Sequence, residues 1–220
     1  MQKIALTALL FGLVLSTSQA QSKLGLKFAP VFANSRTDLS FDDVANDTLD
    51  IENDGTGTKF SLGLIFDYEI TETYYFSTGL VYLPKRVAFS VTGENGGTYP
   101  NPSEEYRLQY LQIPISLKLF TNEIMPDLSV YFQVGGAAEI KLHEEPMEEQ
   151  FTLIEKFNPL DASVILGSGV EYRAGVSTII FGGISYQRGL INTVNNTTPA
   201  LPDEFTIRNT VVMLELGVKF

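Results

Sequence analysis

The side chain most often used for proton transfer near neutral pH occurs once in this sequence, as His143. Glu144 and Glu145 follow it directly, so an imidazole and two carboxylates lie close together along the chain. This grouping raises the hypothesis of a general base for an enzyme that acts on lipid, with a serine supplied by another loop or strand. The alternative is a solvated loop histidine, which we favour because the sequence shows no evident triad.

Carboxylates gather in two polar stretches, and Ca²⁺ prefers several carboxylate ligands. The first stretch contains Asp38, Asp42, Asp43, Asp47, Asp50, Glu52 and Asp54, and the second contains Glu144, Glu145, Glu148, Glu149 and Glu155. Residues 42–54 lack the D-x-D-x-D-G spacing of a calcium loop. The pattern is therefore more typical of solvated loops, and divalent-cation binding by them stays an open alternative.

Composition excludes several kinds of site. The chain of 220 residues has 26 acidic and 15 basic residues and a net charge of −11, which argues against a nucleic-acid partner because such proteins need a basic face. Cysteine is absent, which excludes disulfides and thiolate zinc sites, and one histidine excludes a multi-histidine metal site. We therefore predict no catalytic, cofactor-binding or metal-ligating residue and no cofactor.

The first twenty residues have the pattern of a secretory signal peptide. Lys3 precedes the apolar residues 4–15, and Ser18 and Ala20 place small side chains at the −3 and −1 positions of a cleavage site. We expect cleavage before Gln21 and export from the cytoplasm. The alternative is an uncleaved N-terminal anchor, although the apolar stretch is short for a spanning helix.

The remaining residues, 21–220, are predicted to form one domain of eight long strands. Apolar and polar or small side chains alternate with a period of two in residues 23–33, 59–68, 74–90, 105–120, 129–142, 161–173, 177–190 and 206–220. Several segments reach ten residues, the length that crosses a bilayer at a tilt, and long and short polar connections alternate between them. The pattern predicts an all-β, eight-stranded antiparallel up-and-down transmembrane β-barrel with long external loops and both termini on the periplasmic side.

The side chains that alternate with the apolar ones indicate which face of the barrel contacts lipid and which lines the lumen. They combine isolated charges of both signs with small residues, namely Gly25, Gly63, Gly79, Gly135, Gly167, Gly169, Gly217, Lys27, Asp67, Lys118, Glu139, Lys141, Glu171, Arg173, Glu215 and Lys219. Glycine weakens an exposed strand, whereas a narrow lumen filled by side chains suits it. We therefore expect lipid on the apolar face and a buried ionic network inside. A soluble ligand-binding barrel is the alternative.

Aromatic residues near the segment ends are typical of an interfacial girdle. They are Tyr68, Tyr74, Tyr75, Phe120 and Tyr172. The strand preference of aromatic residues is the alternative explanation.

Three motifs resemble a known family. Residues 108–119, LQYLQIPISLKL, are similar to the Y-L-x-I-P-x-x-x-K strand of PorT-like outer-membrane barrel proteins of Bacteroidetes, and YQRGL at 186–190 with Ile191 and Asn192 resembles their Y-x-x-G-L-x-N segment. LELGVKF at 214–220 resembles their last strand. The resemblance implies an eight-stranded porin-like barrel inserted by the barrel-assembly machinery, with Phe220 in the recognition signal. The founding member is linked to a secretion system, but no residue here carries that role.

Together these observations favour a non-enzymatic, monomeric protein of the outer membrane with a structural role or a partner bound by its loops. Its expected contacts are outer-membrane lipid, the assembly machinery through Phe220 and a loop partner that the sequence does not identify. A small transport pore, a component that assists protein secretion and a lipid-modifying barrel enzyme are the alternatives. A filled lumen would disfavour the pore.

Overall fold

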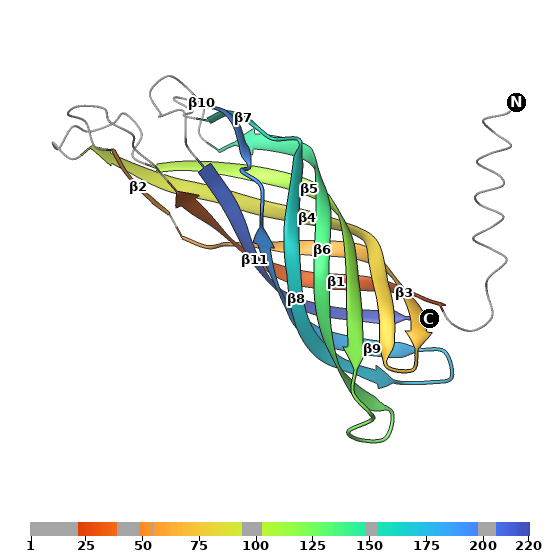
Figure 1. Ribbon diagram of the computed structural model, residues 1–220. Coiled ribbons are helices and arrows are strands. Elements are labelled where there is room, and N and C mark those ends of the chain that lie inside the picture. The colour runs from red at the N-terminus through yellow and green to blue at the C-terminus, as the bar shows by residue number, and fades with distance from the viewer. Residues whose placement is uncertain (1–21, 39–48, 54, 94–102, 148–153, 198–205) are drawn as a thin grey trace, which may run out of the picture.

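In a computed structural model, the described residues are 22–38, 49–53, 55–93, 103–147, 154–197 and 206–220, and they form eleven β-strands (Figure 1). The strands are β1 (Ser22–Asp38), β2 (Leu49–Asn53), β3 (Gly57–Thr71), β4 (Tyr74–Gly93), β5 (Ser103–Phe120), β6 (Leu128–Pro146), β7 (Ile154–Phe157), β8 (Leu160–Arg173), β9 (Ile179–Gly189), β10 (Val194–Thr197) and β11 (Thr206–Lys219). No helix among these residues is long and apolar enough to cross a membrane.

Eight of the strands close into an antiparallel barrel. Their order is β4-β3-β1-β11-β9-β8-β6-β5, and pairing of β4 with β5 completes the circle. The first and last strands are neighbours, and the backbones of Leu24 and Phe220 exchange hydrogen bonds of 2.8 and 3.2 Å. The predicted eight-stranded antiparallel barrel is therefore confirmed, with strands near the predicted positions.

Three short strands lie in stretches that the sequence predicted to be only polar loops. β2 pairs with the far end of β4, and β7 and β10 form a separate two-stranded sheet. Ile154 and Phe157 of β7 and Val194 of β10 are buried. The prediction was wrong here because four or five residues are too few to show a period of two.

Side-chain alternation places the apolar face outside. Leu24 is 56% exposed, Phe60 61% and Leu216 59%, whereas the intervening side chains are mostly buried. Strand β9, whose parity was ambiguous because three apolar residues are consecutive, follows the same rule. Ile179 and Phe181 point inward and Ile180 points outward.

The barrel has two unlike ends (Figure 1). The strand ends joined by residues 72–73, 121–127 and 174–178, together with Ser22 and Phe220, form what we call the turn end. The opposite end carries β2, β7 and β10, and we call it the loop end. The predicted signal peptide, residues 1–20, lies outside the described residues.

Candidate functional site in the barrel lumen

An aromatic layer lies inside the barrel at the turn end. The rings of Tyr75 and Phe120 meet edge to face at 4.9 Å between centroids, and the rings of Phe120 and Tyr131 lie 5.7 Å apart. Tyr75 also donates a hydrogen bond of 2.7 Å to Glu69. The predicted girdle was therefore wrong for Tyr75 and Phe120, because strand parity turns both side chains into the lumen.

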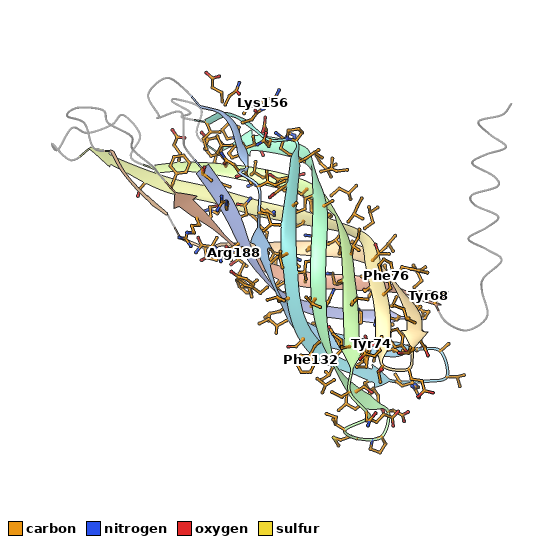
Figure 2. The ribbon with its side chains drawn as sticks, in the orientation of Figure 1. Tyr68, Tyr74, Phe76, Phe132, Lys156 and Arg188 are labelled. Carbon is orange, nitrogen blue, oxygen red and sulfur yellow. The ribbon has the colours of Figure 1, made fainter. Side chains whose placement is uncertain are left out.

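The other three predicted girdle residues do point outward. Tyr68, Tyr74 and Tyr172 are exposed on the outer face near the turn end, and Figure 2 labels Tyr68 and Tyr74 there. They occupy the position expected of aromatic residues at a membrane interface.

Glycines in the wall make room for the inward aromatic rings. A Cβ atom on Gly169 or on Gly183 would lie 2.6 Å from the hydroxyl oxygen of Tyr131. A Cβ atom on Gly217 would overlap the ring of Phe181. Gly169 and Gly217, two of the glycines that the sequence placed on the lumen face, are therefore needed because large rings lie directly against their backbone.

A buried ionic cluster lies directly beside this layer, with the Lys118 ammonium 5.3 Å from the centroid of the Tyr131 ring. Lys118 donates to Asp67 at 2.9 and 3.2 Å, and Lys219 donates to the same carboxylate at 2.5 Å. Lys219 also pairs with Glu171, and Ser77 donates to Asp67 at 2.5 Å. Two cations and two carboxylates from four strands thus balance each other, which offsets the cost of burying them.

A smaller ion pair links β1 and β11. Lys27 donates to Glu215 at 3.0 Å, and Ser185 of β9 donates to the same carboxylate at 2.9 Å. All three side chains are buried. The pair therefore links the first and last strands of the barrel from the lumen side.

A third network crosses the lumen toward the loop end. Lys85 pairs with Glu139 and, at 3.2 Å, with Asp161. Gln112 donates to Glu139 at 2.9 Å and to Gln187 at 2.7 Å. The predicted internal network is therefore present among the described residues. Lys85 and Asp161 were missed, although each shares the parity of an inward neighbour, Ser77 and Ser163.

Apolar clusters fill the space between and above these networks. One cluster contains Ala29, Val31, Ala33, Leu83, Val211 and Met213. The other lies at the loop end, where β7 and β10 pack on the barrel wall, and contains Val87, Phe89, Tyr106, Leu108, Tyr110, Ile154, Phe157, Val194 and Ile207. Tyr106 and Phe157 meet edge to face at 5.1 Å. These clusters present mainly apolar surface, which does not support a water-filled path.

Two small cavities lie among the described residues. One inside the barrel, beside Lys27, Gln112 and Glu215, has a volume of about 20 Å³, close to the minimum for a single water molecule. A cavity of about 90 Å³ opens at the turn end beside Tyr75 and Arg173. Arg173 was predicted to lie in the lumen, but it is exposed at this rim, 3.9 Å from Glu123. That prediction was wrong because Arg173 is the last residue of β8.

His143 lies near the loop end of β6, exposed to solvent, and pairs in register with Gln109. Its acidic neighbours face basic residues, with Glu144 2.6 Å from Lys141 and Glu145 3.5 Å from Arg107. No group of three or more histidine or acidic side chains in the described part of the chain is placed to hold a metal ion. The acidic residues 42–47, Asp54 and residues 148–149 lie outside the described residues.

Residues 18–195 match the family of outer membrane protein beta-barrel domains. The chain belongs to this family. As a member of the outer-membrane barrel family, it is an integral protein of the outer membrane, with its apolar band in the bilayer. No curated protein sequence matches it.

Solved structures of outer-membrane barrels are similar to this family member. Neisserial surface protein A is 13% identical with a TM-score of 0.48, and the match covers 89% of this chain and 95% of that one. The outer membrane protein AlkL is 16% identical with a TM-score of 0.46, covering 92% and 91%. Ail of Yersinia pestis, in complex with a heparin analogue, is 12% identical with a TM-score of 0.41, covering 91% and 99%.

Proposed function

We propose that this barrel is a non-enzymatic outer-membrane protein that acts through its loop end rather than through its lumen. The proposal rests on the filling of the barrel lumen by side chains. From the aromatic layer at the turn end to the β7–β10 sheet at the loop end, ionic and apolar side chains fill the described interior. A protein that passes solutes would need a continuous polar path.

A conductance measurement tests this proposal against the pore alternative. The purified full chain is inserted into a planar bilayer, and we expect no stable open channels because the networks around Lys85 and Lys219 span the lumen. Stable, repeated conductance steps from the unmodified chain would overturn the proposal.

The loop end is the surface that we propose to contact a partner. β7 and β10 are held on the barrel by apolar packing, and their outward side chains, such as Lys156 (labelled in Figure 2), are exposed. A photo-crosslinking amino acid at Lys156 is expected to capture a cell-envelope partner. The same group at Val176, exposed in a connection at the turn end, is the matched control. Equal capture from both positions would contradict a role for the loop end.

Within the family of outer-membrane barrels, we propose that this chain belongs to the PorT-like subfamily. The motifs at residues 108–119, 186–192 and 214–220 support this. This membership makes a component that assists protein secretion the second candidate function. Deletion of the encoding gene is expected to reduce the amount of secreted protein in the culture medium. Unchanged secretion would remove this candidate and leave the structural role.

Export, assembly and oligomeric state complete the proposal. We propose cleavage before Gln21, insertion by the barrel-assembly machinery through Phe220, and a monomer in lipid without nucleic-acid partners or cofactors. N-terminal sequencing of the mature protein tests the cleavage. Fractionation with outer membranes, together with heat-modifiable migration on gels, tests the inserted barrel.

The enzyme alternative depends on His143. Its exposure and the ion pairs made by its acidic neighbours support a solvated side chain. A lipid-hydrolysis assay is expected to show no difference between the unmodified chain and His143→Ala. Activity that is abolished by this substitution would restore the enzyme hypothesis.

A further inference from the structure

Arginines cluster on the outer face of three neighbouring strands, on the loop side of the apolar band. Arg36 of β1 pairs in register with Arg208 of β11. Two residues along β11, Thr210 pairs with Arg188 of β9, so Arg188 is the diagonal neighbour of Arg208. Arg36, Arg188 and Arg208 are exposed, and Figure 2 shows Arg188 on the outer surface of the barrel wall. We call Arg188 and Arg208, on the adjacent strands β9 and β11, the arginine patch.

Another pair of arginines on the same barrel shows how such charges are usually compensated. Arg86 of β4 pairs in register with Arg107 of β5. Arg86 is 2.9 Å from Glu105, and Arg107 is 3.5 Å from Glu145. Each guanidinium of this pair therefore has its own carboxylate close by.

The arginine patch differs in this respect. Among the described residues, no carboxylate forms an ion pair with Arg188 or Arg208. The cross-strand neighbours of Arg188 are Thr210 and Val164, which carry no charge. Like charges opposite each other in a sheet repel, so the patch is arranged to receive an anion from outside the barrel.

The position of the arginine patch along the membrane normal indicates which anion it contacts. Toward the turn end, the next outward pair is Val212 and Tyr186, followed by Leu214 and Ile184, all of them on the apolar band. Phe220 lies twelve positions after Arg208 in the sequence, which at about 3.3 Å per position and a tilt of about 45° is about 28 Å along the membrane normal. This matches the hydrocarbon thickness, so the guanidinium groups lie at the level of lipid headgroups.

We propose that the arginine patch binds the phosphate groups of a phosphorylated lipid in the outer leaflet. The inference rests on the membrane placement of the proposed function and names the class of lipid recognised there. A guanidinium group can donate two parallel hydrogen bonds to a phosphate, and the guanidinium groups of Arg188 and Arg208, on adjacent strands, can share its oxygens. The apolar side chains on the membrane side then contact the acyl chains of the same lipid.

Lipid titration followed by native mass spectrometry tests the patch with the full chain in nonionic detergent. The probes are diphosphorylated lipid A, the same lipid after removal of its phosphates, and inorganic phosphate. Replacing both Arg188 and Arg208 by Gln is expected to weaken binding of the phosphorylated lipid about 25-fold, at about five-fold for each positive charge near the membrane surface. Arg173→Gln, which removes the same charge from the turn end, is expected to bind the lipid as the unmodified chain does.

Three results would overturn the proposal: full binding of the phosphorylated lipid by the double Gln variant, equal binding of the dephosphorylated lipid by the unmodified chain, or displacement of the lipid by an equal concentration of inorganic phosphate. Heat-modifiable migration verifies that each variant is folded. The double Lys variant, which keeps the charge without the planar fork, is a second test and is expected to bind with intermediate affinity. Because the assay uses purified protein, its outcome is separate from the conductance and crosslinking tests.

Discussion

At the scale of single residues, the lumen depends on charges that are buried together. Lys27 and Glu215 are 3.0 Å apart, and their side chains are 9% and 8% exposed. Loss of one partner leaves the other charge buried without compensation, and this costs more than the pair contributes when it is intact. The pair is therefore suited to a double-mutant cycle.

Glu215→Gln alone is expected to lower the free energy of unfolding by about 3 kcal/mol, because it leaves the Lys27 ammonium without its counter-charge. Urea unfolding of the folded protein in lipid measures this. The double variant Lys27→Met/Glu215→Gln is expected to be more stable than Glu215→Gln, because both charges are then removed. Additive losses in the double variant would contradict the coupling.

A second prediction at this scale concerns packing against glycine. Gly169→Ala is expected to cost about 1–3 kcal/mol of unfolding free energy, because the new methyl group meets the Tyr131 hydroxyl and the backbone of β9. At Gly175, in a turn, an added Cβ atom would have no heavy atom within 4 Å, so Gly175→Ala is the matched control and should leave the unfolding midpoint unchanged. Equal stability of the two variants would contradict this prediction, because it would show that the Tyr131 side chain can move away from the new methyl group without cost.

At the scale of elements, β7 and β10 form a separate unit that rests on the barrel. Their two-stranded sheet has four residues on each side and is too short to be stable in water alone. It is held by Ile154, Phe157 and Val194 against the barrel wall, and Lys141 donates a hydrogen bond of 2.5 Å to the carbonyl of Phe157. We therefore expect this sheet to open without unfolding the barrel.

Phe157→Ala is expected to expose the β7–β10 sheet, because truncation of a buried aromatic side chain costs about 3–5 kcal/mol. Hydrogen exchange should become faster at the backbone amides of position 157 and Thr193, which are hydrogen-bonded in the unmodified chain, while the strands of the barrel remain protected. Lys156→Ala, at an exposed position of the same strand, should change neither. Faster exchange throughout the barrel would contradict the independence of this unit.

At the scale of the whole molecule, closure of the barrel joins its first and last strands. Twelve register pairs connect β1 to β11, and Phe220 bonds to Leu24 through the backbone while its side chain stays 62% exposed. The aromatic ring of Phe220 therefore contributes little to packing within the barrel. This leaves it accessible to the assembly machinery that we propose as its partner.

Phe220→Ala is expected to reduce the amount of barrel inserted in cells several-fold, while the unfolding midpoint of the purified, folded variant changes little. The reason is that an exposed side chain on the lipid face can be read during assembly without supporting the folded core. Quantifying heat-modifiable protein in outer membranes measures the first effect. Leu216→Ala, at another exposed position of β11, is the control and should insert at the normal level.

The period of two in the sequence determined the strands and the environment of each face. Leu24, Lys27 and Glu215 could be assigned to lipid or lumen without a structure, because adjacent side chains of a strand must point to opposite sides. The same rule would have placed Lys85 and Asp161 in the lumen. It would also have turned Tyr75 and Phe120 inward, away from the girdle.

Tertiary structure alone decided which interior groups meet. Lys219 and Asp67 are 152 residues apart, and Lys27 and Glu215 are 188 residues apart, so their contacts depend on the register of every strand between them. The same holds for the packing of β7 and β10 on the loop end and for the alignment of Arg36, Arg188 and Arg208. Parity along one strand gives a direction for each side chain, whereas the height at which it lies is set by hydrogen bonding between strands around the closed barrel.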